Sequence, residues 1–200
     1  MHLGPVEDAP PPFLAWQRDR VSTIASSGQP SAVRQVARVQ LACPDPWSVP
    51  VVRALEAAGV VVDRQAPVGV AVTAGRAVPT TVDGWTVDSL PHLLVAVRPW
   101  AVEVGPWVAP GVGPCARCVS AGVLDEGRPA APDDLAPSHL LAMAGGWVGR
   151  EVLEWRAGRV PATWLTSWRL DHDPVSGQRR WERHPYCGCS WFDAAVADHA

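Results

Sequence analysis

The stretch GPCARC, residues 113–118, carries two cysteines separated by two residues, and HPYCGCSW, residues 184–191, carries two more. A Cys-x2-Cys pair places two thiolates on one tight turn, at a spacing suited to a single tetrahedral ion. Glycine and proline flank both pairs and favour such turns. The sequence therefore predicts a closed, structural zinc site formed by Cys115, Cys118, Cys187 and Cys189.

Other interpretations of the four cysteines stay open. The N-terminus has neither the basic start nor the apolar core of a secretion signal, so we expect a cytoplasmic chain with reduced thiols rather than disulfides. A redox dithiol also uses the Cys-x-x-Cys spacing, and four unrelated buried cysteines would need no metal. His184 can replace one cysteine as a ligand, but we expect it beside the site or on the surface. Cys43 stands apart and is expected to be a small buried hydrophobe.

The composition limits the class of protein. The chain has 200 residues, of which 48% are apolar, and its net charge is −3. A sizeable core can form, and no basic surplus points to nucleic acid as a partner. All 17 basic residues are arginines, which excludes Schiff-base lysines and a phosphate-binding loop lysine. No run of about 18 apolar residues occurs, so we expect no membrane span.

The order of elements in the first half predicts an α/β fold. Residues 1–34 are expected to form an N-terminal arm, with one short helix around residues 13–21, ahead of a domain over residues 35–200. A helix is expected between Ser48 as its cap and Gly59 as its stop. Four segments are expected to be strands of a sheet built around a βαβ unit, namely VARVQLAC (36–43), VVVD (60–63), VGVAVTA (68–74) and HLLVAV (92–97).

The second half predicts a long helix followed by a hairpin. The helix is expected over residues 138–158, capped by Ser138 and ended by Gly158. Gly145 and Gly146 inside it predict very close packing against a neighbour, because each costs about 1 kcal/mol against alanine. Residues 162–171 alternate like a strand, and a hairpin should lead to the second cysteine pair. Zinc would then staple the C-terminal half, and its binding energy would be folding energy.

Three segments together resemble a known family. They are VGPWVAPGVGPCARC (104–118), a helix running toward EWRAG (154–158), and W-x-x-HPYCGC (181–189). They resemble the zinc-binding end of the ThiF-like partner proteins of YcaO cyclodehydratases, the bacteriocin biosynthesis cyclodehydratase domain family, over roughly residues 35–191. The resemblance implies a degenerate, truncated ThiF-like (Rossmann-type) sheet with a zinc-stapled C-terminal half.

The resemblance also implies a function in making azole- or azoline-containing ribosomal peptides. In this family the YcaO enzyme performs the ATP-dependent cyclodehydration of a precursor peptide. The ThiF-like partner is mostly non-catalytic, and it binds the leader of the precursor or docks to the enzyme and activates it. We therefore expect a scaffold that binds a YcaO-type enzyme and helps to present the precursor; a homodimer is also typical of the family.

Two departures from the family pattern refine this expectation. The turn LACPDPWSVP, residues 41–50, has no glycine, and Pro44 and Pro46 remove N–H groups that would hold phosphate, so no nucleotide binding is predicted. Only about thirty residues precede the first strand, fewer than an independent recognition domain needs, so precursor recognition is expected on a separate chain. The alternatives are a ThiF-type ATP-dependent adenylating enzyme and an unrelated zinc-ribbon interaction module.

Overall fold

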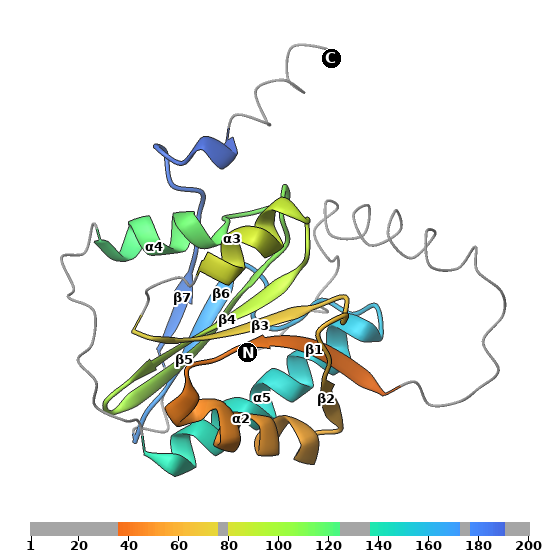
Figure 1. Cartoon of the computed structure of the whole chain (residues 1–200). Coiled ribbons are helices and arrows are strands. Elements are labelled where there is room, and N and C mark those ends of the chain that lie inside the picture. Colours follow the sequence, from red (N-terminus) through yellow and green to blue (C-terminus); the bar gives the residue numbers. More distant parts are fainter. Residues whose placement is uncertain (1–35, 76–79, 125–136, 173–176, 191–200) are drawn as a thin grey trace, which may run out of the picture.

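The structure is a computed structural model that describes residues 36–75, 80–124, 137–172 and 177–190. Its centre is a seven-stranded sheet with the strand order β2-β1-β3-β4-β5-β6-β7 (Figure 1). The strands are β1 (Ala37–Ala42), β2 (Val60–Val62), β3 (Gly69–Ala74), β4 (His92–Arg98), β5 (Ala101–Val108), β6 (Thr166–Leu170) and β7 (Gln178–Arg180). Strands β2, β1, β3 and β4 run parallel, whereas β5, β6 and β7 are antiparallel to their neighbours. The predicted α/β class is confirmed.

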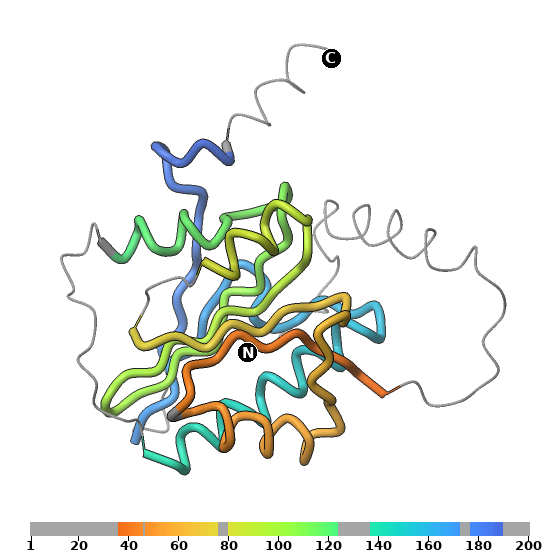
Figure 2. Tube along the Cα trace, viewed as in Figure 1, coloured from red at the N-terminus to blue at the C-terminus, as the bar shows by residue number. Residues whose placement is uncertain are grey.

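Helices cover both faces of this sheet, as Figures 1 and 2 show. The helices are α2 (Asp45–Ala57), α3 (Thr80–Val87), α4 (Ala116–Leu124) and α5 (Ser138–Arg156). Helices α2 and α5 pack on one face through a large buried cluster that includes Leu55, Trp107 and Val148. Helices α3 and α4 lie on the other face over a smaller cluster that includes Trp85, Val119 and Trp181. No helix in the described ranges is long and apolar enough to cross a membrane.

The predicted βαβ unit is confirmed, because β1, α2 and β2 follow one another and β1 pairs with β2 in parallel. The predicted serine caps are wrong. Helices α2 and α5 start after Pro44 and Pro137, and no side chain caps either helix. Proline fixes the backbone angle that a helix start needs, so it can set the boundary without a capping hydroxyl. The hydroxyl of Ser48 donates instead to the carbonyl of Asp45 at 2.9 Å.

The close packing predicted for α5 occurs against α2. A Cβ on Gly145 would lie 2.3 Å from the Cβ of Ala54, and one on Gly149 would lie 2.3 Å from the Cβ of Ala58. The prediction is therefore right for Gly145 and wrong for Gly146, where a Cβ would meet nothing within 4 Å. The second close contact comes one helical turn later, as the periodicity of a helix requires.

The C-terminal hairpin is also confirmed. Strands β6 and β7 pair in antiparallel register from Thr166 opposite Arg180 to Trp168 opposite Gln178. Trp164 lies before this strand and forms an isolated bridge with Trp107. The hairpin returns the chain toward α4, so the residues after β7 reach the start of that helix. The N-terminal arm and its short helix fall outside the described residues.

Candidate metal centre

The first cysteine pair straddles the start of α4. Cys115 immediately precedes the helix, and Cys118 lies in its first turn. The backbone N–H of Val119 donates to the carbonyl of Cys115 at 3.1 Å, which closes this turn. A helix N-terminus presents unpaired N–H groups and favours negative charge, so it suits thiolate ligands. Both sulfur-bearing residues are buried.

The second pair lies on the segment that follows β7. A turn closed by the N–H of Cys187 and the carbonyl of His184, at 2.9 Å, precedes the short helix Gly188–Ser190 that contains Cys189. Arg183 donates to the carbonyl oxygens of Gly111 and Gly113, at 3.0 Å and 3.2 Å, and so ties this segment to the loop before α4. Sequence reasoning missed Arg183, although its place just before the second pair could have signalled a tethering role.

The four predicted cysteines come together. Their sulfur atoms all lie within 4.8 Å of one another. The separations are 3.7 Å between Cys115 and Cys118, 3.6 Å between Cys115 and Cys187, and 3.3 Å between Cys118 and Cys189. A disulfide requires about 2.0 Å, so none of these pairs is bonded.

The spacing and the donor type fit a metal ion. Metal–sulfur bonds of about 2.3 Å in a tetrahedron place the sulfurs about 3.8 Å apart, close to the separations observed. Four sulfur donors suit a soft or borderline cation better than magnesium or calcium. A search of the described residues for clusters of cysteine, histidine and acidic side chains that can hold a metal finds these four cysteines.

The protein environment concentrates negative charge on Cys118. The hydrogen bond from Cys115 lowers the pKa of Cys118 to about 4, and the backbone N–H of His184 and the thiol of Cys189 act in the same direction. The pKa of Cys115 is raised because its thiol donates to Cys118 and is buried. Burial and the bond to Cys118 raise the pKa of Cys189 to about 11. A cation at this point would compete with protons for the sulfur atoms, because metal-bound cysteines are deprotonated.

Two neighbouring candidates lie outside the cluster. His184 contributes its backbone N–H to Cys118, while its ring Nδ1 accepts from the N–H of Tyr186 at 3.3 Å. It therefore lies beside the site, as expected. Cys43 is distant in sequence from the cluster and lies in the turn between β1 and α2. Burial raises its pKa to about 12. We expected a small buried hydrophobe, and Cys43 is partly buried and packs against the larger apolar cluster.

Known structures share this fold. The heterocyclase TruD matches with a TM-score of 0.61 and 20% identity, over 77% of this chain and 27% of TruD. A heterocyclase in complex with substrate and cofactor matches with a TM-score of 0.59 and 16% identity, over 91% of this chain and 26% of that chain. E. coli MccB with ATP matches less well, with a TM-score of 0.48 and 13% identity over 66% of this chain and 45% of that chain. Comparison with protein-family models and with curated proteins gives no match.

The chain has a heterocyclase-like fold. The resemblance predicted from the cysteine motifs is thus confirmed at the level of the fold, at low sequence identity. The chain spans about a quarter of the length of these two heterocyclases. The ThiF-like class expected from the sequence agrees with the mixed sheet and with a cysteine cluster that can hold a metal.

Proposed function

We propose that this protein is a non-catalytic partner of a YcaO-type cyclodehydratase in the biosynthesis of azole- or azoline-containing ribosomal peptides. It docks to the enzyme and helps to present the precursor peptide, directly or through a separate recognition protein. The observation that carries the proposal is the match to the heterocyclase TruD over 77% of this chain. The match covers 27% of TruD.

We further propose one structural Zn²⁺ per chain, bound by Cys115, Cys118, Cys187 and Cys189. Four thiolate ligands close the coordination sphere and leave no open position for a water or a substrate. The site then supplies stability rather than chemistry, because it ties the start of α4 to the segment after β7. Metal analysis of the purified protein tests this assignment, and a folded sample without a bound divalent metal would contradict it.

A ThiF-type adenylating enzyme is the first alternative. The turn between β1 and α2 is the position where the parallel half of such a sheet binds phosphate. Here the turn consists of Cys43 and Pro44, and α2 begins with Asp45 in its first turn. A prolyl nitrogen has no proton to donate, and an acidic residue repels phosphate, so both features oppose nucleotide binding at this helix.

An unrelated zinc-ribbon interaction module is the second alternative. A ribbon is a small unit that folds around its own metal. Here the four cysteines belong instead to a domain built on a seven-stranded sheet. Cys118 lies inside α4, and Cys187 and Cys189 follow β7. This arrangement favours the heterocyclase-partner proposal over an independent ribbon.

Reconstitution tests the proposal. The cognate YcaO protein, the precursor peptide and ATP are incubated with and without this chain, and products are analysed by mass spectrometry. We expect loss of one water per ring only when both proteins are present. Equal product without this chain would contradict a partner role. Exchange of pyrophosphate with ATP by this chain alone would favour the adenylating alternative instead. Sedimentation of the isolated chain tests the expected homodimer.

A further inference from the structure

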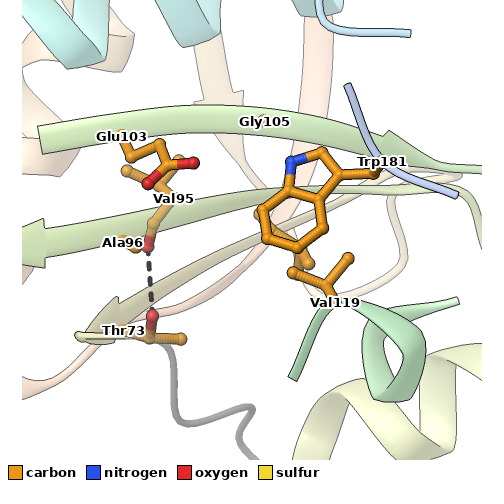
Figure 3. A pocket seen from close by; sticks show the side chains of 8 residues that line it. Thr73, Val95, Ala96, Glu103, Gly105, Val119 and Trp181 are labelled. Carbon is orange, nitrogen blue, oxygen red and sulfur yellow. Dashed lines mark hydrogen bonds between the residues drawn. The ribbon is translucent and has the colours of Figure 1, made fainter. Parts of the chain in front are cut away.

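Strand β7 lies at one edge of the sheet, and among the described strands it pairs only with β6 (Figure 1). Its inner side is anchored by Trp181, the residue after β7, whose indole points toward Val119 of α4 (Figure 3). The indole N–H donates to the hydroxyl of Ser167 at 2.9 Å, and that hydroxyl donates to Glu103. Trp181 and Glu103 line a pocket of about 20 Å³, which has room for about one water molecule. The inner side of β7 therefore offers no ligand site, and its outer edge is the side to consider.

The hydrogen bonds between β6 and β7 fix which backbone groups of β7 face outward. Bonded residue pairs alternate with non-bonded pairs in an antiparallel ladder. The two bonded pairs at the ends of this ladder are Arg169 with Gly177, at 2.9 Å, and Trp181 with Leu165, at 2.8 Å. Arg179 lies midway between them, opposite Ser167, and so must bond to β6 in the same way. The N–H and C=O groups of Gln178 and Arg180 therefore point away from β6, along the outer edge.

The outer edge of β7 is accessible. Gln178 and Arg180 are both exposed, and no described residue forms an ion pair with Arg180. Each residue carries one outward N–H and one outward C=O, so the edge presents donors and acceptors in a row. Unpaired groups of this kind are a template on which another extended chain can add a strand.

The charge of this edge selects the added strand. Residues 177–190 carry three arginines against one glutamic acid, although the whole chain has a net charge of −3. Two copies of β7 paired edge to edge would bring four arginines together within two three-residue strands, and like charges across strands are destabilising. The edge therefore disfavours a second copy of this chain and favours a negatively charged segment.

We propose that the outer edge of β7 binds an extended, acidic segment of another protein, which adds a further strand to the sheet. The backbone of that segment pairs with the outward N–H and C=O groups of Gln178 and Arg180. An acidic side chain of the segment meets the guanidinium of Arg180. This binding is separate from the proposed metal site and does not depend on the proposed partner role.

Amide hydrogen exchange of the full chain, followed by NMR, tests the proposal with an octapeptide of alternating glutamate and valine. We expect the amide protons of Gln178 and Arg180 to exchange at least about tenfold more slowly at saturating peptide, because they become hydrogen-bonded. The amide of Arg179 already bonds to β6 and is the internal control. No slowing at Gln178 and Arg180, or slowing in β2 at the opposite edge instead, would overturn the proposal.

Charge variants test the acidic preference. Arg180→Gln should weaken binding of this peptide about two- to fivefold, the range of an exposed ion pair. Arg156→Gln is the matched control, because Arg156 is exposed in the last turn of α5 and loses the same charge. A peptide of alternating lysine and valine should bind more weakly than the glutamate peptide. Equal binding of the two peptides would contradict selection by charge.

Backbone changes test the strand pairing. Gln178→Pro removes an outward N–H but spares the ladder to β6, because proline is tolerated on a strand edge, and should weaken binding about two- to tenfold. Two N-methylated peptides keep the test decisive should this variant fail to fold, one methylated at every glutamate and one at every valine. Successive N–H groups of a strand point to opposite edges, so only one of these peptides should lose binding. The same behaviour of both would overturn strand pairing.

A second copy of this chain is the competing occupant. Hydrogen exchange without peptide, at several protein concentrations, identifies it. We expect the amides of Gln178 and Arg180 to stay unprotected at every concentration. Protection that grows with concentration would show that a second copy covers the edge, and the proposal would be wrong.

Discussion

On the face of the sheet covered by α2 and α5, helices pack directly on one another and on a large apolar cluster, whereas the α3 and α4 face has a small cluster, a pocket and four cysteines. The first face depends on contacts as close as that between Gly149 and the Cβ of Ala58. The second face depends on groups that titrate or can bind a metal. Close helix packing therefore stabilises one face of the sheet, and metal-binding or titrating groups contribute to the stability of the other.

The two faces should therefore respond to different perturbations: one to added side-chain volume, the other to metal removal or a change in pH. A metal chelator or a change in pH should act first on the α3 and α4 face. Added volume at Gly145 or Gly149 should act first on the α2 and α5 face, where a Cβ would lie 2.3 Å from the Cβ of Ala54 or Ala58. Helix α5 lies between the two cysteine pairs in sequence, yet it packs on the opposite face from them. Its stability should therefore follow α2 rather than the metal site.

Removal of the metal is expected to have the largest effect. Structural zinc contributes roughly 10–16 kcal/mol in small zinc-dependent peptides, so its loss should release α4 and the segment after β7. Hydrogen exchange with and without a chelator, or in Cys118→Ser, measures this. We expect lost protection in residues 116–124 and 181–190, with protection kept in α2 and α5. Cys43→Ser is the control, and uniform loss of protection would contradict the separation of the two faces.

The sequence predicted the cysteine cluster because paired spacing and turn residues constrain where the sulfurs lie. It predicted β1 from its alternation and β2 to β4 from short apolar runs. Strands β3 and β4 are buried as such runs suggest, whereas Val61 and Val62 of β2 are exposed. It did not predict α3, whose eight residues include glycine and three threonines; that helix forms because Val82 and Trp85 are buried beneath it. Tertiary burial here overrides a weak local preference.

Strand β5 was missed for a related reason. Its Gly105-Pro106 step argues against a central strand. The structure accommodates the proline where the register between β4 and β5 shifts, between the pairs Leu93–Trp107 and Val95–Val104. The polar wall of the pocket was missed as well, because Glu103 and Ser167 are 64 residues apart and only the pairing of β5 with β6 joins them.

Acidification is expected to have the next largest effect, through His92. This side chain is fully buried against Trp85, and its Nδ1–H donates to the carbonyl of Leu90 at 2.9 Å. Burial lowers its pKa to about 4. The folded state keeps it neutral, while the unfolded chain takes up a proton below about pH 6.5. Its contribution is therefore intact above that pH and is lost progressively down to about pH 4, up to about 3 kcal/mol.

Chemical denaturation across this pH range measures the effect. The His92→Gln variant cannot titrate, so its free energy of unfolding should fall less on acidification than that of the unmodified chain. His139→Gln is the control, because His139 is exposed near the start of α5. Parallel pH profiles for the unmodified chain and His92→Gln would exclude His92 as the source.

Added volume on the other face is expected to cost somewhat less. Gly149→Ala would place a Cβ 2.3 Å from the Cβ of Ala58, so α2 and α5 must separate. Overpacking of this kind costs typically about 1–3 kcal/mol. Denaturant unfolding measures it, and metal content should stay unchanged because the cysteines lie on the opposite face. An unchanged midpoint, or loss of metal, would show that the two faces do not respond separately.

The smallest expected effect has the opposite sign. Gly146 follows directly after a tightly packed glycine in α5, but a Cβ there would meet nothing within 4 Å. Alanine in the middle of a helix is favoured over glycine by about 0.5–1 kcal/mol, because glycine loses more backbone entropy on folding. Gly146→Ala should therefore raise the denaturation midpoint while Gly149→Ala lowers it. If Gly146→Ala also lowered the midpoint, that surface of α5 would be covered in solution, and the partner-docking face would have to be sought there.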